Sequence, residues 1–492
     1  MKEAIFNMIK KASVNLPSDV TEALMQAKNQ EEKNSRSELS LETILKNIQK
    51  AQNLNSPICQ DTGLPTFFIK IPEGQSQKTI KLAATEAVKE ASEKGFLRPN
   101  AVDSINGKNS GDNTGDYFPI FYFEEVSSDS NLEIQLLLKG GGSENVSDQI
   151  SLPAQLKDYG NAGRNIEGVK KSILQVVKNA QGKGCAPGIL SIHIGSDRAG
   201  GYYQAKKNLL LPIGLSANIQ TEHEEVLKKL ESEILEESKK MNIGPMGLGG
   251  KTTLLDCKIS TSHRLPASFF VSVAYMCWAS RKSSCQFEYK NNDWKIIPQK
   301  KKGIINIPLS KTSETSESTN IKKLNFPISE EEARSLKIGD TVLLSGVIYT
   351  GRDSLHAYAQ DNNLSKNISG SAIYHCGPVA IQEQEKWKFT AAGPTTSIRE
   401  EPYQADFIKK TGIRAVIGKG GMGAKTLQGL KASGAIYLHA IGGAATYYAQ
   451  SVKEVKSVEY LEFGIPEAMW EIEVKDFLAI VSMDSHGGSL HG

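Results

Sequence analysis

The stretch Ile413-Arg-Ala-Val-Ile-Gly-Lys-Gly-Gly-Met-Gly423 joins a short β-rich run to a cluster of glycines. Residues 424–432 then have the composition of a helix, and residues 435–439 form a second β-rich run. A strand, a glycine turn, a helix and another strand are typical of a layered α/β domain. We therefore predict a smaller, C-terminal α/β layered domain over residues 324–492.

The N-terminal part of the chain is richer in helical patterns. Residues 1–50 have apolar positions at helical spacing, with helix starts predicted at Asp19 and Ser40. Further helices are predicted at 79–94, 169–180 and 222–241, and strands at 132–138 and 269–274. These patterns predict a large N-terminal α+β domain over residues 1–286, and a mixed α/β (α+β) fold for the whole chain.

A polar segment separates the two predicted domains. Residues 300–302 are a short basic run, and residues 310–319 are polar and of low complexity. Such a composition buries too little apolar surface to fold alone. We therefore predict a polar linker over residues 287–323.

The composition is that of a globular protein without a strong charge bias. Of 492 residues, 39% are hydrophobic and 23% are charged, and the formal net charge is +3. This near balance disfavours nucleic acid or an anionic membrane as a partner. The longest apolar stretch, residues 265–279, is shorter than the ~20 residues of a spanning helix, and residues 1–16 lack a signal-peptide pattern. We expect a cytoplasmic protein with reduced thiols.

Two glycine clusters follow predicted strands. Gly418–Gly423 fits G-x-G-x-x-G, but His439 stands where a dinucleotide-binding fold has an acidic residue, and the lysine of a phosphate loop is missing. Backbone N–H groups at a helix start can also hold a carboxylate. Gly140–Gly142 beside Lys139, and Gly418–Gly423 with Lys419, are candidates for that role. Alternatively, these glycines only permit tight turns.

Six cysteines are too few for a disulfide scaffold, and the absence of a C-x-x-C pair disfavours a zinc ribbon or a thioredoxin site. Cys59 and Cys185 lie in loops that contain glycine and proline, and Cys277 ends an apolar run. The other three cysteines share no pattern: Cys257, Cys285 and Cys376. A single intracellular cysteine is usually a small buried hydrophobe, so the cysteines alone leave the function open.

Five motifs occur along the chain in a recognisable order. They are Pro57-Ile-Cys-Gln-Asp-Thr-Gly63, Lys139-Gly-Gly-Gly-Ser-Glu-Asn145, Thr350-Gly-Arg-Asp353, Gly393-Pro-Thr-Thr-Ser-Ile-Arg399 and Ile417-Gly-Lys-Gly-Gly-Met-Gly423. Together they resemble the class I, iron–sulfur-dependent fumarate hydratases and their relatives, the L(+)-tartrate dehydratases. The region before the linker resembles the α part of that family and the region after it the β part, fused here in one chain.

The resemblance implies a [4Fe–4S] cluster held by Cys59, Cys185 and Cys277, with one iron left open for catalysis. It implies an enzyme, a hydro-lyase that adds water reversibly to fumarate and gives L-malate. The nearest alternative is an L(+)-tartrate dehydratase or a related hydroxy-dicarboxylate hydro-lyase. An alternative of a different class is a non-catalytic iron–sulfur sensor.

The same resemblance implies roles for individual residues. The candidates for binding the small dicarboxylate substrate are Gln60, Arg98, Gly141, His263, Arg352, Arg399 and Lys419. Asp61 corresponds to the general acid that protonates the departing hydroxyl, and Thr395 to the base at the proton-bearing carbon. Alternatively, Thr395 only positions the substrate, and His263 is a satisfied core histidine.

Two further expectations come from the resemblance. The family suggests a homodimer. The implied site residues come from both sides of the predicted linker, so we expect neither half of the chain to work alone.

Overall fold

The computed structural model describes residues 1–217, 222–290, 293–298, 307 and 321–491. The chain divides into two compact units. Unit 1 comprises Met1–Leu41, Thr62–Phe96 and Asn100–Asn306, and unit 2 comprises Glu42–Asp61, Leu97–Pro99 and Ile307–Gly492. The low-complexity segment 310–319 lies outside the described residues.

The N-terminal region is helical, as the apolar spacing predicts. Its helices are α1 (Lys2–Val14), α2 (Ser18–Gln30) and α3 (Arg36–Leu54), of which α3 continues from unit 1 into unit 2. The start predicted at Asp19 lies within one residue of the observed start of α2, although Asp19 is not its capping residue, whereas the start predicted at Ser40 is wrong because α3 begins at Arg36. Asp19 lies inside the first turn of α2, where its carboxylate accepts the N–H of Ile213, and Ser40 lies inside α3, where its hydroxyl donates to Arg36. Both side chains form hydrogen bonds with groups other than the N–H groups at a helix start.

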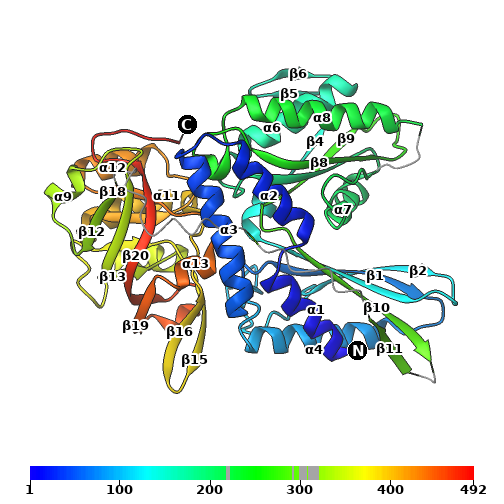
Figure 1. Cartoon of the computed structure of the whole chain (residues 1–492), viewed down its shortest axis with the longest axis horizontal. Helices are drawn as coiled ribbons and strands as arrows, with labels where there is room; N and C mark the ends of the chain where they lie inside the picture. The colour runs from blue at the N-terminus through cyan, green and yellow to red at the C-terminus, as the bar shows by residue number, and fades with distance from the viewer. Residues whose placement is uncertain (218–221, 291–292, 299–306, 308–320, 492) are drawn as a thin grey trace. The chain divides into compact units, whose positions relative to one another are not determined.

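The five-stranded sheet of unit 1 has the order β11-β10-β3-β1-β2. Its strands are β1 (Leu64–Pro72), β2 (Ile120–Val126), β3 (Leu132–Lys139), β10 (Arg281–Lys290) and β11 (Asp293–Ile297). Helix α1 packs on α4 (Gln77–Glu93) and on β3 and β10, and Figure 1 shows both helices beside this sheet. The β10–β11 hairpin occupies the described residues at the start of the segment predicted as a linker.

The second sheet of unit 1 has the order β4-β9-β7-β8. Its strands are β4 (Asp148–Ser151), β7 (Gly188–Ile194), β8 (Leu254–Thr261) and β9 (Phe270–Met276), and a separate pair is β5 (Ala154–Leu156) and β6 (Gly160–Ala162). The remaining helical segments are α5 (Gly141–Asn145), α6 (Ile166–Ala180), α7 (Arg198–Asn208), α8 (Glu224–Lys240) and η1 (Pro245–Gly247). Helices α6, α7 and α8 pack on this sheet, so every residue of its central strand β7 is buried.

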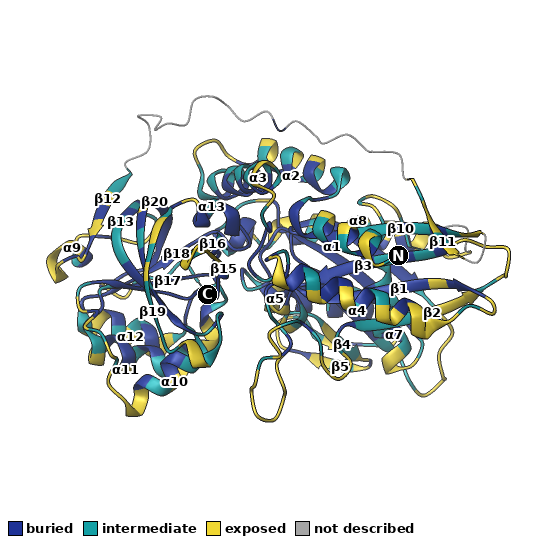
Figure 2. Cartoon of the chain, turned by 90° about the horizontal axis from the view of Figure 1, so that it is seen from below, coloured by how far each residue is buried: buried dark blue, intermediate teal, exposed yellow. Residues whose placement is uncertain are grey.

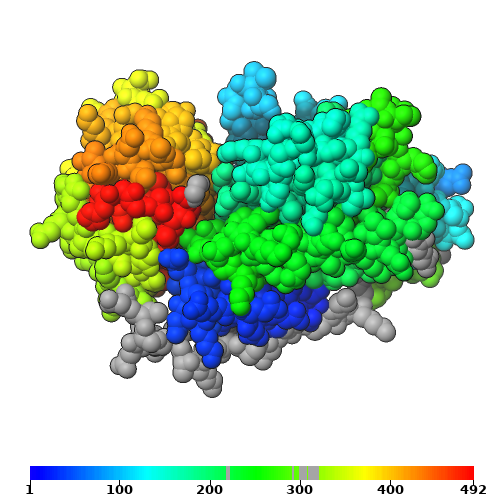
Figure 3. Space-filling model, turned by 90° about the horizontal axis from the view of Figure 1, so that it is seen from above, coloured from blue at the N-terminus to red at the C-terminus, as the bar shows by residue number. Residues whose placement is uncertain are grey.

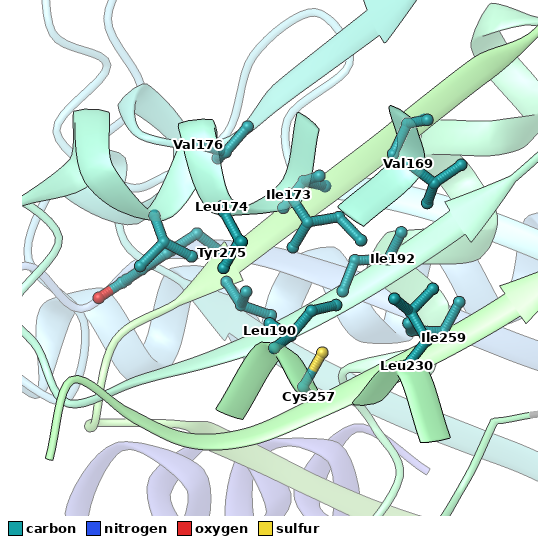
Figure 4. Packing of buried hydrophobic residues seen from close by; sticks show 14 of the residues in the cluster. Val169, Ile173, Leu174, Val176, Leu190, Ile192, Leu230, Cys257, Ile259 and Tyr275 are labelled. Carbon is teal, nitrogen blue, oxygen red and sulfur yellow. The ribbon is translucent and has the colours of Figure 1, made fainter. Parts of the chain in front are cut away.

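Apolar residues at helical spacing form the core between α6 and this sheet. Val169 and Ile173 of α6 face Leu190 and Ile192 of β7, as Figure 4 shows. Cys257 of β8 lies in the same cluster, and burial raises its pKa well above the ordinary value of a thiol. Cys257 is therefore a small buried hydrophobe.

The sheet of unit 2 has the order β12-β13-β14-β17-β18-β20-β19. Its strands are β12 (Lys322–Phe326), β13 (Thr341–Thr350), β14 (Ala372–Tyr374), β17 (Ala415–Gly418), β18 (Ile436–His439), β19 (Val452–Glu459) and β20 (Met469–Met483). Strands β13, β14, β17 and β18 are parallel, and β20 runs antiparallel to both β18 and β13, which closes a ring of pairings. A separate hairpin consists of β15 (Val379–Glu383) and β16 (Lys386–Ala391).

Helices cover the parallel strands of unit 2. They are α9 (Glu330–Arg334), α10 (Asp353–Asp361), η2 (Ser397–Glu400), α11 (Glu401–Thr411), α12 (Ala424–Ser433), α13 (Ala445–Ala449) and η3 (Leu461–Phe463). In Figure 2, α10, α11 and α12 show exposed residues outward, whereas the strands are largely buried. The predicted strand–glycine–helix–strand unit is confirmed as β17, α12 and β18, and the mixed α/β fold is confirmed with it.

The last described residues lie on the surface of unit 2, drawn in red in Figure 3. His491 bonds to the hydroxyl of Ser482 at 2.9 Å, and its ring lies over Gly421. None of the helices in the described residues combines the length and hydropathy that a bilayer crossing requires.

Candidate functional site

The carboxyl ends of the parallel strands in unit 2 carry several predicted site residues. Arg352 follows β13, and Lys419 follows β17. Thr395 joins the same edge through its backbone: its N–H donates to His375 O, beyond β14, at 2.7 Å, and its carbonyl oxygen accepts the N–H of Lys419 at 3.2 Å. Parallel strands bring their carboxyl ends to one edge, where ligands bind in α/β sheets. The fold therefore gathers Arg352, Thr395 and Lys419 at this edge of the sheet.

Arg399 connects Thr395 with the start of α10. Its Nη2 donates to Thr395 Oγ1 at 3.4 Å and lies 3.0 Å from Asp353 Oδ2. The guanidinium is about one-third exposed. It can therefore hold the Thr395 hydroxyl and still present N–H groups to an anion.

Two further guanidinium groups are buried near one another. Arg98 donates from Nη1 to Gly377 O at 2.8 Å, and its Nη2 lies 3.9 Å from Asp61 Oδ1. Burial, and next the charge of Arg352, lowers the pKa of Arg98 below its ordinary value. Burial also acts to lower the pKa of Arg352, but the carboxylates of Glu467 and Asp353 outweigh it and raise that pKa. An anion bound here relieves the repulsion between Arg98 and Arg352.

Gln60 and Cys59 end the N-terminal segment that belongs to unit 2. Gln60 Nε2 donates to Pro394 O at 3.0 Å, and Cys59 Sγ lies 3.5 Å from Gln60 Oε1. A side chain at Gly393 would meet Gln60 Oε1 at 2.2 Å. The absence of a side chain at Gly393 therefore lets Gln60 pack against the loop that carries Thr395.

Cys185 and Cys277 come together within unit 1. The N–H of Trp278, the next residue after Cys277, donates to Cys185 O at 3.5 Å, and the N–H of Cys277 donates to Ser143 Oγ at 3.3 Å. Ser143 belongs to α5, which begins at Gly141. Two of the three predicted cluster ligands and Gly141 therefore share one region of unit 1.

Lys139, beside the first glycine cluster, forms an ion pair with Glu144. Lys139 is buried, and its ammonium donates to Glu144 Oε2 at 2.7 Å and to Ser147 Oγ at 3.1 Å. Burial lowers the pKa of Lys139 to about 8, against the opposing effect of Glu144. Lys139 is thus ion-paired with Glu144, and a role for it in holding a ligand carboxylate stays a prediction.

The second glycine cluster also binds a carboxylate of the chain. Glu401 accepts the N–H of Gly423 at 2.7 Å, and the N–H and hydroxyl of Thr426 at 3.2 and 2.6 Å. These donors form the start of α12. Gly420 and Gly421 have φ of 76° and 74°, so the tight-turn explanation holds for them.

His263 is exposed in unit 1, and its carbonyl oxygen accepts the N–H of Ser196 at 3.1 Å. The alternative of a satisfied core histidine is therefore wrong, because the ring is not buried. Contact of His263 with a substrate stays a prediction.

The comparisons with known proteins cover the whole length of the chain. Residues 2–286 match the family model described as fumarate hydratase (Fumerase), and residues 292–492 match the one described as fumarase C-terminus. The chain belongs to the fumarate hydratase family. The predicted resemblance and the predicted hydro-lyase class are thereby confirmed.

Individual relatives agree with this membership. The "Putative fumarate hydratase class I" of Geobacillus stearothermophilus is 48% identical over 497 residues, 99% of this chain and 95% of the relative. The "Putative L(+)-tartrate dehydratase subunit alpha" of Methanocaldococcus jannaschii is 34% identical over 58% of this chain and 96% of the relative. The "L(+)-tartrate dehydratase subunit beta" of Escherichia coli K12 is 37% identical over 34% of this chain and 86% of the relative.

All six cysteines of this fumarate hydratase family member are buried. None of the six, all in the described part of the chain, forms a disulfide. Burial raises the pKa of Cys285 and of Cys376 to about 12, so these thiols stay protonated at neutral pH, as Cys257 does. Thiolates, not thiols, ligate iron. The donor type and the meeting of Cys185 with Cys277 fit an iron–sulfur group, although no three metal-binding side chains cluster within the described residues.

Sequence reasoning missed three residues of this region. Glu400 is fully buried, Glu401 binds the start of α12, and His375 bonds to Ser397 Oγ at 2.7 Å and Gln404 Oε1 at 2.8 Å. Glu400 and Glu401 directly follow Arg399, so their position in the motif was the only available signal.

Proposed function

We propose that this chain catalyses the reversible hydration of fumarate to L-malate. Membership of the fumarate hydratase family supports the reaction class. The observation that carries the proposal is the group of buried cations in unit 2, where Arg98 and Arg352 both approach Gly377. Such a group suits a dianionic substrate, because each guanidinium can bind a carboxylate through two N–H groups.

The reaction moves one proton and one hydroxyl, with no net oxidation. Dehydration of malate removes a proton beside a carboxylate, where negative charge develops in the transition state. We assign the binding and stabilisation of the carboxylates to Arg98, Arg352, Arg399 and Lys419. Hydrogen bonds to the substrate are assigned to Gln60, Gly141 and His263.

The proton transfers are assigned to Thr395 and Asp61. Thr395 is the base, and its hydroxyl already accepts a hydrogen bond from Arg399 at 3.4 Å. A cation at that distance lowers the free-energy cost of forming the alkoxide of Thr395, which is the form that can take the proton from the substrate carbon. Asp61, 3.9 Å from Arg98, is the acid that protonates the departing hydroxyl.

Cys59, Cys185 and Cys277 are the residues proposed to hold a [4Fe–4S] cluster. When bound, this group supplies a Lewis acid for a substrate carboxylate and hydroxyl. The three residues are 5–8% exposed, whereas Cys376 is 0% exposed. We also propose a homodimer located in the cytoplasm, on the family resemblance alone, and sedimentation of the cluster-loaded protein tests the dimer.

A second candidate function is the dehydration of L(+)-tartrate, which the tartrate dehydratase relatives favour. Tartrate differs from malate by one additional hydroxyl. The test is purification without oxygen, reconstitution of the cluster, and separate assays with fumarate, L-malate and L-tartrate. We expect turnover of fumarate and malate. Turnover of tartrate but not malate would reverse the assignment, and a loaded protein inactive with all three would favour an iron–sulfur sensor.

A further inference from the structure

A buried carboxyl group lies directly behind the proposed base. Glu400 ends η2, the helical turn that joins the loop of Thr395 to α11. Its residue exposure is 0%, and neither carboxyl oxygen has a hydrogen-bond partner among the described residues. An ionised carboxylate is strongly disfavoured without water or donors, so this environment favours the neutral form of Glu400.

The guanidinium of Arg399, the cation next to Glu400, hydrogen-bonds to other acceptors. Nη2 of Arg399 lies 3.0 Å from Asp353 Oδ2, 3.4 Å from Thr395 Oγ1 and 3.8 Å from Glu400 Oε1. This nitrogen carries two hydrogens, which the two nearer oxygens can accept. At 3.8 Å the Glu400 oxygen is beyond hydrogen-bond distance. Asp353 and Thr395 therefore take the hydrogen bonds of Arg399 Nη2, and Glu400 receives none from it.

The charges that face Glu400 come from several elements. Asp353 stands at the start of α10 with Arg352 just before it, Arg399 lies in η2, and Tyr437 of β18, whose pKa the charge of Glu400 raises, donates its hydroxyl hydrogen bond to Ser397. Burial, and next the negative charge of Asp353, raises the pKa of Glu400 to about 8, against the opposing effect of both arginines. The carboxyl is thus neutral over most of the physiological range.

We propose that Glu400 is a positioning residue, which in its neutral form leaves the guanidinium of Arg399 to Asp353 and to the hydroxyl of Thr395. This inference rests on the proposed function of Thr395 as the base. An ionised Glu400 becomes a third and charged acceptor for Nη2. It draws Arg399 away from Thr395, and the hydroxyl then loses the cation that stabilises its alkoxide form.

The first test compares pH profiles of the cluster-loaded wild type and Glu400→Gln, with kcat and KM for L-malate measured from about pH 6 to about pH 10. Glutamine has nearly the shape of a neutral glutamic acid but cannot ionise. We expect the wild-type kcat to fall above about pH 8, and the Gln variant to keep its kcat to higher pH with an unchanged KM. The matched control is Asp406→Asn, an exposed carboxylate of α11, which should follow the wild type. An identical alkaline decline in wild type and Glu400→Gln overturns the proposal.

The second test measures the melting temperature of the same proteins as a function of pH. Glu400 in the folded chain keeps its proton up to about pH 8, whereas an unfolded glutamate releases it near pKa ~4.3. The folded state binds more protons in this window, so wild-type stability falls as pH rises through it. We expect Glu400→Gln to gain in melting temperature relative to wild type between about pH 5 and about pH 8. If the melting temperatures of wild type and Glu400→Gln change with pH in parallel while the enzyme is active, only the Glu400 proposal is overturned. If the wild type hydrates no dicarboxylate, the proposed function itself is wrong.

Discussion

Nη1 of Arg98 donates a hydrogen bond of 2.8 Å to the carbonyl oxygen of Gly377, a residue 279 positions further along the chain. Arg352 approaches Gly377 as well, because a Cβ at this glycine would lie 2.6 Å from Arg352 Nη1. Gly377 is thus the point at which two buried guanidinium groups converge. Its lack of a side chain leaves the space that Arg352 Nη1 occupies.

Gly377→Ala is expected to displace Arg352 and weaken substrate binding. The new methyl group would also meet Pro466 O at 2.6 Å, and such overpacking typically destabilises by about 1–3 kcal/mol. We expect a rise of about tenfold or more in KM for fumarate, the equivalent of ~1.4 kcal/mol of binding. Steady-state kinetics and chemical unfolding measure the two effects. Gly115→Ala is the control, since a Cβ there meets nothing within 4 Å, and equal kinetics in both variants would contradict the assignment.

Thr395→Val removes the proposed base and keeps the shape of the side chain. We expect kcat to fall by about 10²-fold or more with little change in KM, because a general base acts in the transition state. Thr395→Ser retains a hydroxyl beside Arg399 and should keep much of the activity. Exchange of the malate proton with deuterated water, followed by NMR, checks the same step. If Thr395→Val raises KM and leaves kcat intact, Thr395 only positions the substrate.

Cys185→Ser is expected to abolish cluster binding, whereas Cys376→Ser should leave it intact. Burial raises the pKa of Cys376 to about 12, so giving up its proton to an iron is less favourable than for an ordinary thiol. Iron and sulfide content after anaerobic purification, together with the visible absorption of the cluster, measures the outcome. Equal loss of iron from both variants would overturn the choice of ligands.

Glu401→Ala is expected to destabilise the protein through the start of α12. The substitution leaves the N–H groups of Gly423 and Thr426 without the carboxylate that accepts them at 2.7 and 3.2 Å. Loss of a helix cap costs about 0.5–2 kcal/mol, measured by denaturant unfolding. Asp406→Asn, on the same helix but exposed, should change stability far less. A Glu401 variant as stable as wild type would show that water replaces the carboxylate.

Local patterns predicted much of the fold. The run from β17 through α12 to β18 follows from residues that are neighbours in the chain, and so does the strand β3 before Gly140. Neither Asp19 nor Ser40 caps a helix, because each side chain bonds elsewhere, to Ile213 and Arg36. The residue type suggests a capping residue, but the partner of its side chain depends on which other donors and acceptors the fold brings within hydrogen-bond distance.

The candidate site, like the fold, could be predicted only in part from the sequence. The order of the motifs was enough to assign the chain to its family and to nominate Thr395 and Arg399. Neighbours in the chain do not reveal that Arg98 meets Gly377, since 279 positions separate them.

Glu400 and Glu401 illustrate the physical reason. They are adjacent and identical in type, yet the carboxyl oxygens of Glu400 are buried without a hydrogen-bond partner among the described residues, whereas Glu401 accepts N–H groups that begin α12. Residue types and local spacing sufficed for the elements, the motifs and the family. The protonation of each charged group depends on how much water folding removes from it, and its partners depend on which donors folding brings near. Residues distant in the chain decide both, so only the tertiary structure determines them.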